Sequence, residues 1–354
     1  MSASSKLRFG FLWCTLPAAA TVLVSCGLAM AQDDSMGLPP RTLQPPASAQ
    51  KESAQQPPSD QQSGEPSISP IQSSEEQGRF VFRKQVQEVV LHATVVDEYG
   101  RLVTSLDRGA FSVYQNGQLE TITSFRREDV PVAIGIVIDN SGSMRDKRAR
   151  VNQAVLNLIQ GSNREDEVFV VNFSQTPYLD QDFTSDVKLL QTALHQVSSR
   201  GSTALYDAVV ASNMHLRNNP RLDKKVLLVV TDGQDNMSRE TLHDALRKLQ
   251  SNKGATLYAI GLMDQGMTRS AREALESLAV STGGAAFFPQ NLDEVDEITR
   301  TIAHDIRSQY ALTYNPGPNI GTDYQRIRVE ARGPARSRLT VRTRTGYYPG
   351  ETVK

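Results

Sequence analysis

Five oxygen-bearing side chains have the types and spacing to bind a hard divalent cation, and three of them alternate along one short segment. Asp139, Ser141 and Ser143 occupy alternate positions of the loop 139–144, which follows an apolar run. One carboxylate and two hydroxyls at alternate positions can turn three oxygens toward one point, and cations such as Mg²⁺ take oxygen ligands. Taken alone the pattern is weak, because Asp and Ser between a strand and a helix are common helix N-caps.

Two further residues of this kind lie in later loops. Thr203 opens a helical pattern that begins at Leu205, and Asp232 follows the apolar run 226–230. Each has an ordinary structural alternative, Thr203 as a helix cap and Asp232 as a turn former before Gly233. The three pieces in this order, each at the end of a predicted strand or in a loop on the sheet, favour a metal site.

Alternating strands and helices must position these residues. Nearly continuous apolar runs, which are typical of strands buried on both faces of a parallel sheet, occur at 132–138, 168–173, 226–230 and 257–262. Between them apolar residues recur at spacings of three and four, and a last helix is predicted over 292–308. The pattern predicts a doubly wound, mainly parallel α/β domain over residues 130–308. Ligands bind such sheets at the carboxyl ends of the strands, where Asp139 and Asp232 fall.

The flanks of this domain have a β pattern. Residues 89–96 alternate in polarity, and Asn116-Gly117 between two short runs is a type I′ hairpin signal. We count about four short strands before Val130 and about three after Tyr310, and three strands alone make a poor independent domain. We therefore expect residues 79–129 and 309–350 to form one small β-sandwich, into which the α/β domain is inserted.

The set Asp139-x-Ser141-x-Ser143, Thr203 and Asp232 resembles a complete metal-ion-dependent adhesion site (MIDAS) of von Willebrand factor A (VWFA) domains. The resemblance covers about residues 130–308, and the flanks resemble bacterial exported VWFA-related proteins more loosely. It implies that Ser141 and Ser143 ligate the ion directly and Thr203 directly or through water. Asp139 and Asp232 would supply charge, partly through waters.

The resemblance also implies a function. One coordination position would stay open for an Asp or Glu carboxylate of a partner protein, and Mg²⁺, with Mn²⁺ or Ca²⁺ as alternatives, would be the cofactor. It suggests a switch in which Thr203 and Asp232 exchange roles while the helix 292–308 shifts. We expect an adhesion or interaction module without catalysis.

Two other functions stay open. A hydrolase could use the metal to activate water, but the sequence has no G-x-S-x-G elbow and no convincing triad. A scaffold could hold a purely structural metal. The formal charge of −1 and the lack of a basic block argue against a nucleic-acid partner.

The amino-terminal segment predicts export. Lys6 and Arg8 precede the apolar stretch 9–24, and Ala29-Met30-Ala31 provides a small-x-small cleavage pattern, so residues 1–31 are interpreted as a signal peptide. An uncleaved anchor is one alternative. A lipobox is another, in which Cys26 would be lipidated and would tether the protein to a membrane. The apolar residues 27–31 favour cleavage before Gln32, which predicts a periplasmic or extracellular protein.

Residues 32–78 are mostly Pro, Gln and Ser and contain no aromatic residue. Such a stretch cannot bury enough apolar surface to offset the entropy of ordering, so we expect a disordered linker. It serves either as a spacer or simply as a tolerated tail. Both cysteines, Cys14 and Cys26, lie in the predicted signal, so a chain beginning at Gln32 has no disulfide and no thiol ligand.

Overall fold

The computed structural model describes residues 41–42, 88–127, 129–195, 199–219, 221–262, 267–317, 321–333 and 338–349. The predicted signal peptide 1–31 and all of the predicted linker 32–78 except Arg41–Thr42 lie outside these residues. All described residues belong to one unit, Pro40–Lys354. Within them no helix has the length and apolar character needed to span a membrane.

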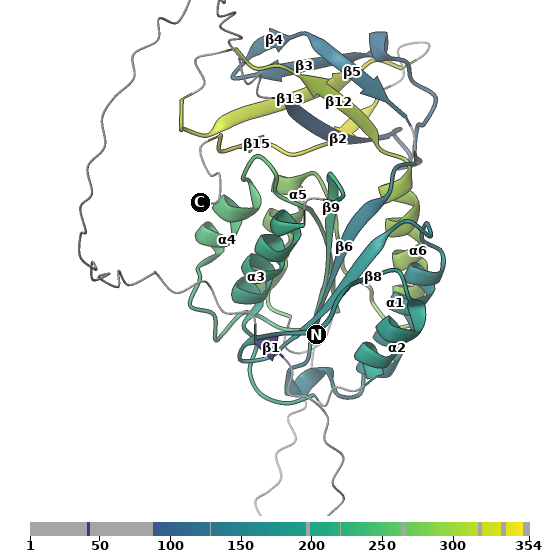
Figure 1. Ribbon diagram of the computed structural model, residues 1–354, viewed down its shortest axis with the longest axis vertical. Helices are drawn as coiled ribbons and strands as arrows, with labels where there is room; N and C mark the ends of the chain where they lie inside the picture. The colour runs from purple at the N-terminus through teal and green to yellow at the C-terminus, as the bar shows by residue number, and fades with distance from the viewer. Residues whose placement is uncertain are drawn as a thin grey trace, which may run out of the picture. The chain divides into compact units, whose positions relative to one another are not determined.

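A mainly parallel sheet forms the centre of the α/β domain (Figure 1). Its order is β1-β8-β7-β6-β9-β10-β11, with β8 antiparallel to β7, β1 antiparallel to β8 and the other pairs parallel. The strands are β1 (Arg41–Thr42), β6 (Val132–Asp139), β7 (Glu167–Phe173), β8 (Pro177–Thr184), β9 (Lys224–Thr231), β10 (Thr256–Gly261) and β11 (Ala286–Phe287). Along the chain the strands are added to one side of β6 and then to the other, which is the doubly wound order predicted from the sequence.

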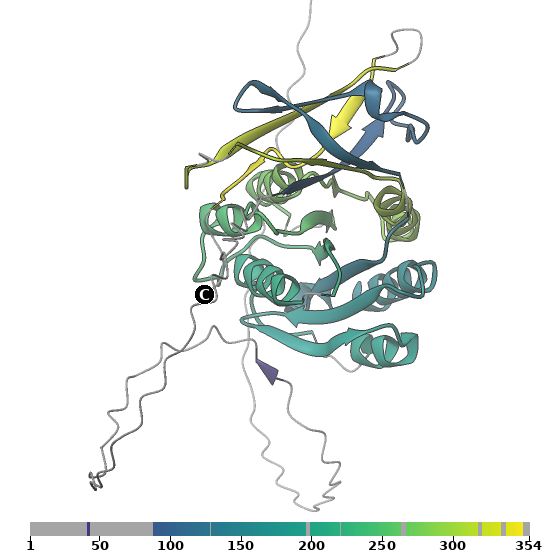
Figure 2. The same cartoon turned by 45° about the horizontal axis from the view of Figure 1, so that its top comes forward.

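Helices cover both faces of this sheet (Figure 2). The helices α1 (Arg148–Gln160), α2 (Val187–His195) and α6 (Glu294–Arg307) pack on one face, and α3 (Leu205–Asn218), α4 (Leu242–Leu249) and α5 (Arg269–Thr282) on the other. Alternate residues of β6 point to opposite faces, so that Ile134 and Ile136 join one core and Ala133 and Val137 the other. This two-sided burial explains the continuous apolar runs.

Three strands of the sheet were not predicted. β1 lies within the range 32–78, for which a disordered linker was expected, and it pairs with β8. β8 lies beyond β7, and most of its residues are only partly buried. Its centre is Asp180-Gln181-Asp182, so a search for apolar runs misses it. β11 has two residues, which is too short for any periodicity.

The flanks form two antiparallel sheets, ordered β14-β2-β12-β5 and β15-β13-β3-β4. Their strands are β2 (Val89–Val96), β3 (Phe111–Gln115), β4 (Gln118–Glu120), β5 (Ile122–Arg126), β12 (Tyr310–Tyr314), β13 (Gln325–Ala331), β14 (Thr340–Arg342) and β15 (Gly346–Tyr347). Each sheet contains strands from before and after the α/β domain, and one buried cluster fills the space between them. The α/β domain is therefore inserted into a sandwich built from both flanks, whose carboxyl-terminal part has one short strand more than the three predicted.

The predicted hairpin joins β3 and β4. Asn116 and Gly117 form its two-residue loop with φ values of 51° and 85°. Positive φ at both central positions defines the type I′ turn, and Asn-Gly is the pair that adopts it most readily.

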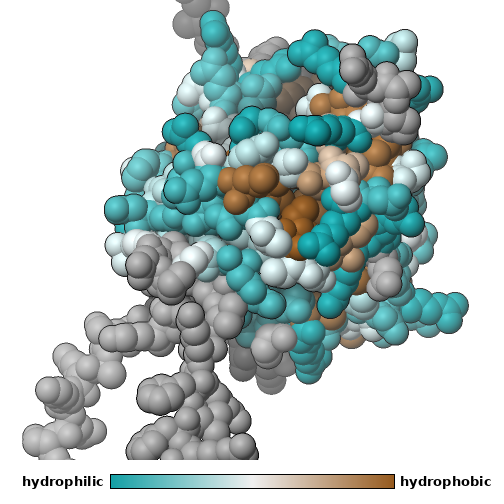
Figure 3. Space-filling view, turned by 90° about the horizontal axis from the view of Figure 1, so that it is seen from above, coloured by the Kyte–Doolittle hydropathy of each residue, from teal (hydrophilic) through white to brown (hydrophobic). Residues whose placement is uncertain are grey.

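Seen from above, the molecule shows a small apolar area within a largely hydrophilic surface (Figure 3).

The sandwich is anchored at the amino-terminal edge of the central sheet. The buried Arg344 donates hydrogen bonds to the carbonyls of Ser251, Asn252 and Gly254, just before β10. At the end of α6, Asp305 accepts hydrogen bonds from Thr94 in β2 (2.8 Å) and Arg342 in β14 (2.8 Å). The opposite edge of the sheet, where the strands end, carries the predicted site.

Candidate metal centre

Loops that follow β6, β7 and β9 and the loop before α3 meet at the carboxyl edge of the sheet. The backbone amide of Gly142 donates to the carbonyl of Gly201 (3.3 Å), and that of Ala204 donates to the carbonyl of Ser174 (2.7 Å). β7 is added on one side of β6 and β9 on the other, so the order in which strands are added reverses at β6. Crevices at such topological switch points are the usual ligand sites of doubly wound sheets.

Three of the predicted residues form a row of oxygens. Ser141 Oγ lies 3.1 Å from Ser143 Oγ, and Ser143 Oγ donates to Asp232 Oδ1 at 2.8 Å. Ser141 and Asp232 are buried, whereas Ser143 is exposed. The exposed Ser143 hydroxyl therefore links two buried side chains, those of Ser141 and Asp232.

Asp139, the last residue of β6, is fully buried beside this row. Its Oδ1 accepts the amide of Ser141 (2.8 Å), and its Oδ2 accepts the hydroxyl of Thr231 (2.6 Å). Burial raises the pKa of the Asp139 carboxyl, and the charge of Asp232 raises it further, while these hydrogen bonds act to lower it. The carboxylate is oriented by two protein donors, so Asp139 is placed to supply fixed negative charge.

Thr203 is the fifth predicted residue that the structure brings to this edge. Its amide donates to Asn236 Oδ1 (3.0 Å), and its carbonyl accepts the amide of Asn236 (3.0 Å). Its Oγ1 would lie 3.6 Å from a Cβ built on Gly233, directly after Asp232. The buried Thr203 is thereby held beside the loop after β9.

Helix capping does not explain the hydroxyls. The N-cap of α3 is Ala204, with no side-chain cap bond, so Thr203 does not cap this helix. Ser141 is the N-cap residue of the 3₁₀ turn Gly142–Met144, and it also makes no side-chain cap bond. The ordinary alternative to a ligand role is thus removed for these two residues.

Two cations at this site were not singled out from the sequence. Lys147 Nζ lies 2.5 Å from Asp232 Oδ2. The buried Arg148 donates to the carbonyl of Asp139 (3.2 Å) and to Asn172 Oδ1. Burial lowers the pKa of Arg148 to about 10. The only signal for either residue is its nearness in sequence to the loop 139–144.

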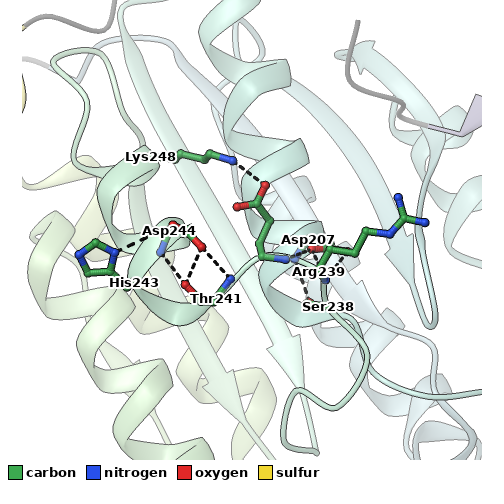
Figure 4. A network of polar contacts seen from close by, with 8 residues as sticks. Asp207, Ser238, Arg239, Thr241, His243, Asp244 and Lys248 are labelled. Carbon is green, nitrogen blue, oxygen red and sulfur yellow. Dashed lines mark hydrogen bonds and ion pairs between the residues drawn. The ribbon is translucent and has the colours of Figure 1, made fainter. Parts of the chain in front are cut away.

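The segment after Asp232 is tied to neighbouring helices (Figure 4). Asp207 of α3 accepts the backbone amides of Arg239 and Glu240. Thr241 begins α4 through a capping box with Asp244. These contacts fix the segment that follows Asp232 on the starts of α3 and α4.

Asp235 also fixes this segment. It accepts the amide of Tyr206 (3.0 Å) and hydrogen bonds from Ser238. Its role in the structure is to hold the loop on the start of α3.

The donor set fits a hard cation. It contains two carboxylates, from Asp139 and Asp232, and the hydroxyls of Ser141, Ser143 and Thr203. Oxygen donors of this kind suit Mg²⁺, Mn²⁺ and Ca²⁺. Across the residues that the structure describes, no group of three or more His, Cys, Asp or Glu side chains is placed to hold a metal. An ion at this site would therefore depend on hydroxyl oxygens and water for its remaining ligands.

Comparison with known families agrees with the predicted fold class. Residues 134–234 match the family model for the von Willebrand factor type A domain, a range that includes all five candidate ligands. The match identifies residues 134–234 as similar to a von Willebrand factor type A domain. No curated protein matches the sequence.

Solved structures give more distant similarity. Proximal thread matrix protein 1 from the mussel byssus has a TM-score of 0.46 and 17% identity, and the match covers 55% of this chain and 51% of that one. A structure of that protein with a zinc-occupied MIDAS motif has a TM-score of 0.44, 18% identity and coverage of 55% and 50%. A von Willebrand factor type A protein from Catenulispora acidiphila has a TM-score of 0.44, 14% identity and coverage of 77% and 76%. The chain thus spans about half the length of the mussel protein.

Proposed function

We propose that this protein is a metal-dependent binding module. Asp139, Ser141, Ser143, Thr203 and Asp232 hold a divalent cation, most suitably Mg²⁺, and a partner protein completes its coordination with an Asp or Glu carboxylate. The observation that carries the proposal is the row of oxygens from Ser141 through Ser143 to Asp232, with separations of 3.1 Å and 2.8 Å and an exposed middle member.

The charge balance of the site supports an anionic partner. Both oxygens of Asp139 accept hydrogen bonds, from Thr231 and the amide of Ser141, and Oδ1 of Asp232 accepts one from Ser143. An ion held largely by neutral hydroxyls and water keeps most of its positive charge. Such an ion attracts a carboxylate from outside strongly, because a divalent cation is the largest local charge in its site.

A binding role also agrees with the surroundings of the serines. Over the described ranges, the hydroxyl of Ser143 contacts Ser141 and Asp232, and the His side chains with ion-pair partners, His215 and His243, pair with Asp182 and Asp244. A serine nucleophile needs an adjacent base. The described contacts of Ser143 include no histidine, so they give no Ser-His pair, and we place the function in recognition.

We further propose that the module works outside the cytoplasm. The support is the charged and then apolar segment at 6–24 with the cleavage pattern at Ala29-Met30-Ala31. Lipidation of Cys26 would tether the protein to a membrane, whereas cleavage before Gln32 would release it.

The test is capture of cell-envelope proteins on the full chain, with Mg²⁺, with a chelator, and with Asp139→Ala. We expect at least one bound protein that is lost in chelator and in the variant, and whose binding is abolished when its acidic residue at the contact is changed to the amide. Identical sets of bound proteins under all three conditions would contradict the proposal.

The two alternatives give different results. A hydrolase would turn over ester, phosphate or peptide substrates in a Mg²⁺-dependent way. A scaffold with a structural metal would lose stability in chelator but keep its partner bound.

A further inference from the structure

The ammonium group of Lys147 lies inside the candidate metal centre. Its Nζ is 2.5 Å from Asp232 Oδ2, and the two side chains are 13% and 0% exposed. Surface ion pairs contribute little because water screens them, but this pair is largely removed from water. Lys147 therefore makes a specific contact with a predicted ligand.

The backbone holds Lys147 in place for this contact. Its amide donates to the carbonyl of Met144 (3.0 Å), and its carbonyl accepts the amides of Arg150 and Val151 (3.1 Å each). Lys147 is thus the N-cap residue of α1 and lies shortly after the loop 139–144 that carries the two serines. The side chain reaches back from this fixed position to Asp232.

The contact balances charge. Asp139 and Asp232 are both buried, and they lie close enough for the charge of one to affect the other. Buried carboxylates need a compensating cation, since an unpaired buried charge is costly. Lys147 provides that cation for Asp232.

A divalent ion that draws on Ser143 and Asp232 would lie only a few ångströms from Lys147 Nζ. Two like charges at such a separation repel strongly in a site shielded from water. Asp232 offers two oxygens, of which Oδ1 accepts Ser143 and Oδ2 accepts Lys147. The ion and the ammonium group therefore compete for the same carboxylate.

We propose that Lys147 is a tethered cation that exchanges with the divalent ion at Asp232. Binding of the ion displaces the ammonium from Asp232 toward the surface, and the cost of this displacement sets the metal affinity of the site. This inference rests on the proposed metal-binding function and assigns its regulation to one residue.

Calorimetric titration of Mg²⁺ into the full chain tests the exchange. Lys147→Met removes the competing charge, and we expect it to bind Mg²⁺ at least about tenfold more tightly than the wild type. Lys147→Arg keeps the charge and should stay within about twofold of the wild type. Arg145→Met removes a charge from an exposed side chain of the same loop, where solvent screens it, and should also stay within about twofold.

Lysine labelling of the unmodified chain, read by mass spectrometry, tests the displacement itself. Lys147 should react slowly in chelator and several times faster in saturating Mg²⁺. Lys253, which is exposed and lies before β10, should react equally in both.

The outcomes separate the two proposals. If the wild type binds Mg²⁺ and Lys147→Met binds it no more tightly, the exchange is refuted and the metal site stands. The same conclusion follows if the wild type binds Mg²⁺ and the labelling rate of Lys147 does not change with Mg²⁺. If neither the wild type nor Lys147→Met binds Mg²⁺, both proposals are wrong.

Discussion

The hydroxyl of Thr231 donates a 2.6 Å hydrogen bond to Oδ2 of Asp139 and so joins the carboxyl ends of β9 and β6 beneath the candidate metal centre. Both residues are fully buried. The bond fixes the Asp139 carboxylate from one side, while the amide of Ser141 fixes it from the other. The loop that carries the two serines is thus oriented by a contact from a neighbouring strand.

Replacing Thr231 tests this contact. Thr231→Val keeps the shape of the side chain but leaves a buried carboxylate oxygen without its donor, which costs about 1–3 kcal/mol of unfolding free energy. Thr231→Ser retains the hydroxyl and should cost less. Urea unfolding of the three proteins measures the difference, and equal stability of Thr231→Val and the wild type would show that the bond does not orient Asp139.

The junction between sandwich and α/β domain depends on a second buried carboxylate. Asp305 of α6 accepts hydrogen bonds from Thr94 and Arg342, each at 2.8 Å, and its side chain is 3% exposed. Asp305→Ala leaves Arg342 without its partner, and loss of one member of such a pair costs roughly 3 kcal/mol. Thr94→Val removes one neutral donor and should cost about 1 kcal/mol. Denaturant unfolding that gave the same loss for both variants would refute this ranking.

The same contacts bear on the helix shift that the family resemblance implies. The carboxyl end of α6 is held by Asp305, by Arg307, which pairs with Asp166 and Asp129, and by Lys224, which donates to the carbonyl of Ile306. A shift of α6 would break these bonds. Hydrogen exchange along 294–307, compared with and without Mg²⁺, would detect it.

Stability near neutral pH should depend on His92. Burial, together with the charges of Lys224 and Arg344, lowers the pKa of His92 to about 3. In the unfolded chain His92 has an ordinary pKa near 6.5 and binds a proton below that pH, whereas in the folded chain it stays neutral. The free energy of unfolding therefore falls as the pH drops below about 6.5. The upper bound is about 1.4 kcal/mol per pH unit. The side chain of His92 is half-buried, so solvent reduces the effect below this bound.

Unfolding at pH 7 and pH 5 measures this dependence. The wild type should lose more stability between the two values than His92→Gln, which does not titrate. An equal loss in the two proteins would mean that His92 accepts its proton in the folded state.

A divalent ion that binds the folded chain but not the unfolded chain should stabilise the folded state. At a Mg²⁺ concentration about 100 times the dissociation constant, the gain is about 2.7 kcal/mol. Chelator should remove the gain, and Asp139→Ala should not show it. A melting temperature that Mg²⁺ leaves unchanged in the wild type would argue against a specific site.

Periodicity and turn chemistry were sufficient to predict most of the fold. Two-sided burial imposes continuous apolar runs on β6 and β9, and the Asn116-Gly117 turn specifies its own hairpin. β8 was missed because it lies beyond β7 and carries Asp180 and Asp182 where an interior strand would be apolar.

The candidate site was only partly predictable. Its five oxygen donors stand out by residue type and spacing, and the structure brings their loops together. The contacts of Thr231 and Lys147 were not foreseen, because they depend on which way one side chain turns at the end of β9 and at the start of α1. Such directions follow from three-dimensional packing.

The most direct test of the central claim is calorimetric titration of Mg²⁺ into the full chain and into the double variant Ser141→Ala, Ser143→Ala. The account predicts one ion bound per chain in the wild type and none in the variant, with both proteins folded by circular dichroism. Equal binding by the two proteins, or no binding by the wild type, would contradict it.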